Sequence, residues 1–131
     1  MRRQIISGLL VATAAAAVSL KLPAAEARSL AGIYSNLTYN EEGGDLLGLE
    51  LLLVPEGDLN HYAVAVQLAE GQSPQLAIAH VEVKKNAFTL SFKLEGVEAP
   101  ITFKCELGAS GLTCVNGLST EKLKRGKSYW Q

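Results

Sequence analysis

The chain has 131 residues, 48% of them hydrophobic, which is enough for one domain. Its 12 lysine and arginine residues are balanced by 13 aspartate and glutamate residues, so the formal net charge is −1. A chain without a basic excess lacks the positive charge that neutralises phosphates, and we therefore expect no nucleic-acid partner.

Residues 1–27 have the pattern of an export signal. Arg2 and Arg3 precede an uncharged apolar run at 5–20, and Ala25 and Ala27 are the small residues of a cleavage site. The apolar run is shorter than the roughly 20 residues that cross a bilayer. We predict a signal peptide at 1–27 and one mature domain at 28–131, with 9 basic and 12 acidic residues and no stable membrane anchor.

From residue 28 onward, apolar and polar residues alternate with a period of two, which indicates an all-β chain. Short segments rich in Gly, Pro, Asn and Asp separate the strands and favour hairpins between antiparallel neighbours. The predicted strands are 33–40, 46–54, 61–68, 75–84, 88–94, 101–107, 112–118 and 122–129. We predict a small antiparallel eight-stranded meander barrel, with a two-sheet β-sandwich as the alternative.

Three acidic residues, Glu41, Glu42 and Asp45, surround the first turn and form a candidate interaction loop. Carboxylates around a turn can bind Ca²⁺, but the spacing is not that of an EF-hand, and we predict no metal site. Glu50 follows inside a leucine-rich strand and must be hydrogen-bonded or face solvent. We expect Thr38 or Asn36 on the neighbouring strand to be its partner.

The strand at 46–54 carries leucines on both of its faces. Either both faces are covered, as in the central strand of a sandwich, or one face is an exposed apolar strip. Such a strip would serve a homodimer or another partner.

No catalytic motif is present. The sequence lacks a nucleophile elbow, a zinc-protease helix motif, a phosphate-binding loop and a dinucleotide fingerprint. His61 follows a turn, and His80 shares a strand face with Leu76 and Ile78, which is typical of packed or surface histidines. We therefore predict no catalytic residue, no cofactor and no enzymatic activity.

Cys105 and Cys114 are the only two cysteines, and an even number in an exported chain indicates a disulfide. Pairing Leu107 with Leu112 across a hairpin places the two cysteines directly opposite each other. A redox role is disfavoured because the pair is not a C-x-x-C motif.

The C-terminus combines basic and aromatic residues, Lys124, Arg125, Tyr129 and Trp130, and is a candidate contact for an anionic polymer or a partner. The alternative is a final strand in which Leu123 and Trp130 close the barrel. Residues 28–70 contain seven acidic residues and one basic residue, Arg28, an asymmetry that would suit acid-to-base association.

Three segments, 32–36, 41–50 and 123–130, with the letters GIYSN, EEGGDLLGLE and LKR followed by SYW, resemble a group of small secreted bacterial proteins of unknown function. The resemblance implies a β-rich exported domain. The start Gly32-Ile33-Tyr34 is also similar to the Gly-x-Trp start of lipocalins.

We expect an exported, non-enzymatic protein, periplasmic or secreted from a bacterium, that binds a small apolar ligand or an envelope protein. The alternative is an inhibitor or immunity protein that blocks an envelope hydrolase through a loop such as 41–45. A third alternative is an enzyme with an unusual site.

Overall fold

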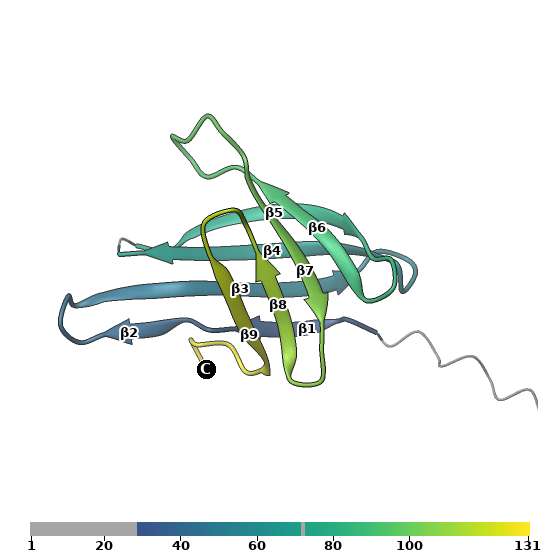
Figure 1. Ribbon diagram of the computed structural model, residues 1–131, viewed down its shortest axis with the longest axis horizontal. Coiled ribbons are helices and arrows are strands. Elements are labelled where there is room, and N and C mark those ends of the chain that lie inside the picture. The colour runs from purple at the N-terminus through teal and green to yellow at the C-terminus, as the bar shows by residue number, and fades with distance from the viewer. Residues whose placement is uncertain (1–28, 72) are drawn as a thin grey trace, which may run out of the picture.

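The computed structural model describes residues 29–71 and 73–131, and the predicted export segment lies outside them. The described residues form nine strands and no helix (Figure 1). The strands are β1 (Gly32–Ser35), β2 (Thr38–Asn40), β3 (Asp45–Pro55), β4 (His61–Glu70), β5 (Gln75–Glu82), β6 (Ala87–Phe92), β7 (Ile101–Leu107), β8 (Gly111–Val115) and β9 (Thr120–Gly126). In this part of the chain no helix has the length and apolar character needed to cross a membrane.

The strands form one antiparallel sheet in the order β5-β4-β3-β1-β9-β8-β7-β6, with β2 paired to β3. Pairing of β1 with β9 brings the first and last strands together and bends the sheet into a barrel. At the two ends of this order, β5 and β6 are linked by one bridge, Lys84 to Ala87, and by no ladder. The predicted eight-stranded meander barrel is therefore confirmed, with one open seam between β5 and β6. In Figure 1, β3, β4 and β5 form a back layer, which β7, β8 and β9 cross in front.

The first predicted strand, 33–40, is interrupted at Asn36. Both halves, β1 and β2, pair with β3 in a single register. At the interruption, the Leu49 amide donates to the Asn36 side-chain oxygen at 2.7 Å, so a side chain replaces a backbone acceptor. The Asn36 backbone lies so close to Gly48 that a Cβ there would be 2.7 Å from the Asn36 carbonyl oxygen. Glycine is required at this crossing.

The last predicted strand, 122–129, is wrong at its end. β9 stops at Gly126, and the next residues turn, with the Gln131 amide donating to the Ser128 carbonyl at 3.2 Å. Leu123 is buried, as the barrel-closing alternative requires, but Trp130 is 57% exposed and lies outside the barrel.

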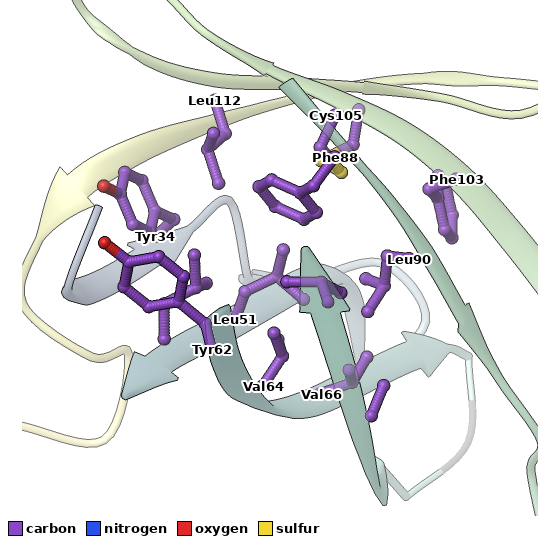
Figure 2. Packing of buried hydrophobic residues seen from close by; sticks show 14 of the residues in the cluster. Tyr34, Leu51, Tyr62, Val64, Val66, Phe88, Leu90, Phe103, Cys105 and Leu112 are labelled. Atoms are coloured by element: carbon purple, nitrogen blue, oxygen red, sulfur yellow. A yellow bond between two sulfur atoms is a disulfide. The ribbon is translucent and has the colours of Figure 1, made fainter. Parts of the chain in front are cut away.

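The barrel interior is filled by the inward-facing side chains of both layers (Figure 2). In β6 the predicted alternation is observed, because Phe88, Leu90 and Phe92 are buried while Thr89 and Ser91 are exposed. The fully buried side chains of the interior include Tyr34, Leu51, Tyr62, Val64, Val66, Leu90 and Leu112.

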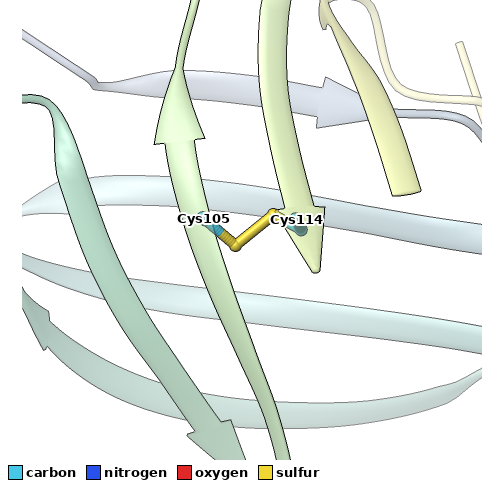
Figure 3. The surroundings of a disulfide bond; sticks show 2 residues. All are labelled: Cys105 and Cys114. Carbon is cyan, nitrogen blue, oxygen red and sulfur yellow. A yellow bond between two sulfur atoms is a disulfide. The ribbon is translucent and has the colours of Figure 1, made fainter. Parts of the chain in front are cut away.

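The predicted disulfide joins Cys105 of β7 to Cys114 of β8 (Figure 3). The register pairs Leu107 with Leu112 and Glu106 with Thr113, as predicted from the sequence. Both cysteines face the interior and are buried, so the bond is part of the core. A disulfide of this kind is consistent with an oxidising compartment.

Candidate functional site

The two layers of the barrel present very different outer surfaces to solvent. On the layer formed by β6 to β9, the outward positions are almost all polar, and we call this surface the polar face. It consists of Thr89, Ser91, Thr102, Lys104, Glu106, Thr113, Lys122 and Lys124, with Val115 as an apolar exception. The polar face shows what an ordinary solvated surface of this barrel looks like.

The outer surface of β1, β3, β4 and β5 is instead apolar at its centre, and we call this central part the apolar face. Polar residues border it, Ser35, Glu50 and Gln67 on one side and His61, His80 and Glu82 on the other. The apolar face consists of Ile33, Leu52, Val54, Ala63, Ala65, Leu76 and Ile78. The strand registers place four of these residues in one continuous row across four strands, in the order Ile33, Leu52, Ala65, Ile78. The most exposed are on β5, where Leu76 is 65% and Ile78 is 61% exposed.

The C-terminal segment lies along one side of the apolar face, held by Glu50. The Ser128 hydroxyl donates to one Glu50 carboxylate oxygen at 2.5 Å, and the Tyr129 amide donates to the other at 2.8 Å. Glu50 is the only buried charged residue of the described chain. The prediction that Thr38 or Asn36 is its partner is wrong. Thr38 pairs with Leu47, and the Asn36 side chain bonds to Glu121 and to the Leu49 amide. The sequence alone does not show that the C-terminal segment folds back to Glu50.

Trp130 is fixed in turn, because its indole N–H donates to the Gln67 side-chain oxygen at 2.8 Å. The ring also packs edge-on against Tyr129, with ring centroids 5.1 Å apart. Between Trp130 and the apolar face lies a groove of about 230 Å³, with Leu52, Ala65 and Leu76 among its lining residues. The arrangement offers an apolar depression beside a rigidly held aromatic ring.

The structure does not bring the four predicted C-terminal contact residues to one place. Lys124 lies on the polar face, whereas Tyr129 and Trp130 lie beside the apolar face. Arg125 covers one end of the barrel, where its guanidinium lies 5.4 Å from the Tyr34 ring centroid and donates to backbone carbonyls before β1.

At the opposite side of the apolar face, the β3–β4 turn and the end of β5 gather carboxylates and both histidines. His61 lies 2.9 Å from an Asp58 carboxylate oxygen, and His80 lies 2.5 Å from one of Glu56. Glu82 is paired with His61 across the strands. The hydrogen bond that the His61 ring donates to Asp58 raises the pKa of His61, while the hydrogen bonds from the Asn60 backbone N–H and the His61 side chain lower the pKa of Asp58.

Among the described residues, these two histidine–carboxylate pairs are the best candidates for general acid–base groups, but they lie on the open surface and not in a cleft. The His61 and His80 side chains are 53% and 70% exposed, and no serine or cysteine of the described residues bonds to either. A general base needs a bound, positioned substrate as well as a carboxylate partner. Their geometry is that of solvated surface ion pairs.

The acidic turn is an ordered, solvated hairpin end. Glu41 and Glu42 are exposed, and the turn is closed by the Gly44 amide donating to the Asn40 carbonyl at 2.8 Å. Asp45 is partly buried at the start of β3. Across residues 29–71 and 73–131, no group of three or more His, Cys, Asp or Glu side chains is placed to hold a metal ion.

The principal cavities of the described chain are at the rims and on the outer faces. The largest, about 580 Å³, is an open groove over β6, β7 and β8 whose lining includes Thr89, Lys104 and Thr113. None of the four principal cavities is lined by Leu51, Val64, Val66 or Leu90, the residues at the centre of the barrel. The centre is filled by side chains.

Sequence reasoning missed most of the apolar face, although the signal is present. Leucines on both faces were recognised for β3, but the same feature occurs in β4 at 62–66 and in β5 at 76–79, where every residue is apolar. The strict alternation of β6 and β7 is the contrast that identifies these runs as strands with two apolar faces.

Comparisons with protein-family models, curated proteins and solved structures find no match for this chain.

Proposed function

We propose that this chain is an exported, non-enzymatic interaction protein that binds a protein partner through the apolar face. The observation that carries the proposal is the unbroken row Ile33, Leu52, Ala65, Ile78 on the outside of a barrel whose other outer surface is polar. Contiguous exposed apolar surface of this kind marks interaction sites. The aromatic residue at its border, Trp130, is of the type enriched in interface hot spots.

The proposal favours a protein partner over a small apolar ligand held inside the barrel. A drug-sized ligand is usually enclosed in a pocket of roughly 300–1,000 Å³. The centre of this barrel is filled by buried side chains from both layers. We place the protein in the periplasm or the extracellular space of a bacterium. The predicted export signal and the disulfide support this location.

The test is site-specific photocrosslinking in the native host, with the crosslinking residue placed at Ile78 on the apolar face. The matched control is Thr102, at the centre of the polar face. We expect a protein adduct from position 78 and none from 102. Equal adducts from both positions, or none from 78, would contradict the proposal.

A hydrolase inhibitor remains the second candidate because the β2–β3 turn presents Glu41 and Glu42 on an ordered backbone. The same experiment with the crosslinker at Glu42 separates the two functions. An adduct with an envelope hydrolase from position 42, without one from position 78, would favour the inhibitor.

A further inference from the structure

We propose that the partner segment is extended, carries one large apolar side chain with basic residues about four positions away, and lies over β5 on the apolar face. This inference rests on the proposed function and adds the chemistry of the partner. Three features carry it: the groove beside Trp130, the carboxylates beyond it, and the exposed apolar side chains of β5 between them.

The groove supplies the anchor position. At about 230 Å³ it has room for one large side chain, and its lining is mostly apolar, with Leu52, Ala65 and Trp130. Its polar members, Glu50, Gln67 and Ser128, are hydrogen-bonded to one another or to the C-terminal segment. A pocket that accepts a single aromatic or aliphatic anchor is the usual centre of a protein interface. The hydrogen bond from the indole to Gln67 holds the groove wall in place before binding, which reduces the entropy lost on association.

The carboxylates supply the charge preference. Residues 29–70, which contain β1 to β4, have seven acidic residues and no basic residue. Beside the apolar face lie three carboxylates. Asp58 contacts His61, Glu56 contacts His80, and the Lys84 ammonium lies 3.8 Å from Glu82. A basic segment complements this border.

The same charge argues against other occupants of the apolar face. A second copy docked by the same surface has no lysine or arginine in β1, β3, β4 or β5 to offer these carboxylates. An anionic phospholipid surface would be repelled by the same carboxylates. A basic protein segment gains from the apolar contact without either penalty.

Strand β5 supplies the spacing. Its outward side chains Leu76 and Ile78 are 65% and 61% exposed, and an extended segment can lie over them between the groove and the carboxylates. From Ile78 to Glu82 the strand advances four residues, about 13 Å. A basic residue about four positions from the anchor therefore reaches the carboxylates.

The test uses the mature chain and two synthetic extended peptides, read by the emission of Trp130, the only tryptophan. One peptide has a phenylalanine followed about four positions later by two lysines, and the other has glutamates in their place. At low salt we expect the lysine peptide to bind about tenfold more tightly. Ala65→Leu, which fills the groove, should abolish binding, and Thr102→Leu on the polar face should not.

The double substitution Glu56→Gln and Glu82→Gln should remove the preference for the lysine peptide. The control is Glu95→Gln and Glu98→Gln on the β6–β7 loop, which removes the same charge and should leave the preference unchanged. Asp58 is kept because it accepts backbone hydrogen bonds in its turn. Equal binding of both peptides, abolished by Ala65→Leu, would overturn the basic partner but leave the apolar face as a binding surface. The inference would be overturned if neither peptide changed the emission of Trp130. It would also be overturned if the protein formed a dimer that Ala65→Leu abolishes, or if it bound anionic vesicles.

Discussion

At the scale of single residues, Leu30 shows how a position outside every strand can hold the barrel together. Its side chain is 1% exposed, its amide donates to the Tyr62 hydroxyl at 3.0 Å, and its carbonyl accepts from the Tyr34 hydroxyl at 3.0 Å. Two buried tyrosines thus satisfy the backbone of a residue that closes one end of the core. The predicted cleavage after Ala27 would leave this residue in place.

We expect Leu30→Ala to lower the free energy of unfolding by about 2–4 kcal/mol, because it opens a cavity in the core and weakens the closure of the barrel end. Urea unfolding of the mature chain measures the change. The control is Leu118→Ala, whose side chain is 98% exposed and should cost less than about 0.5 kcal/mol. Equal effects of the two substitutions would show that Leu30 is not part of the core.

The pair of His61 and Asp58 should give a recognisable pH signature. The raised pKa of His61 means that its stabilising contribution is present below about pH 6.5 and is lost as the pH rises through the raised value. The lowered pKa of Asp58 means that its contribution is present above about pH 4 and is lost as the pH falls through the lowered value. Both residues are therefore ionised between the lowered pKa of Asp58 and the raised pKa of His61.

In an NMR titration, we expect Asp58→Asn to lower the pKa of His61, because the hydrogen bond and the charge of Asp58 are the main causes that raise it. Glu82→Gln should lower it less, since Glu82 acts only through its charge at a distance. An unchanged His61 titration in Asp58→Asn would refute the pairing.

At the scale of elements, the register of the β7–β8 hairpin was predictable to the residue, although β8 ends at Val115 and not at residue 118. The interruption of the first strand and the path of the C-terminal segment were not predictable. Strict alternation, a short glycine-bounded loop and two cysteines fix one register locally. The interruption at Asn36 depends on a side chain replacing a backbone acceptor across the ladder, and the return of Ser128 to Glu50 spans 78 residues of sequence. Neither contact leaves a periodic pattern, so only the buried Glu50 signalled that a partner was needed.

Loss of the Cys105–Cys114 bond should lower the melting temperature without changing the strand content. The chain-entropy model predicts that the bond raises the free energy of unfolding by about 2–3 kcal/mol for a loop of this length. In the double variant Cys105→Ala and Cys114→Ala, packing in the core should keep the hairpin in register. Thermal unfolding with far-ultraviolet circular dichroism measures both properties. An unchanged melting temperature would mean that the bond contributes nothing to the folded state.

At the scale of the whole molecule, the barrel combines a core that sequence alternation predicts with an outer surface that it does not. Period two assigns which side of each strand faces inward, but apolar residues on both sides leave open what covers the second side. For β3 this ambiguity was visible in the sequence. Only the registers of β1, β3, β4 and β5 place the outer residues in one row and turn separate runs into a surface.

The barrel should open locally at the seam between β5 and β6. The two strands are connected by a tight turn in which Lys85 and Asn86 both have positive φ, and beyond the bridge from Lys84 to Ala87 no ladder joins them. Amides that point into the seam lack the strand partner that protects amides elsewhere in the sheet. We therefore expect β5 and β6 to exchange hydrogen faster than β3, which is paired on both sides.

Native-state hydrogen exchange followed by NMR tests this order, with β7 as the control, because it is paired to β6 and β8 and carries the disulfide. Uniform exchange across all strands of the free protein would mean that the seam does not open separately.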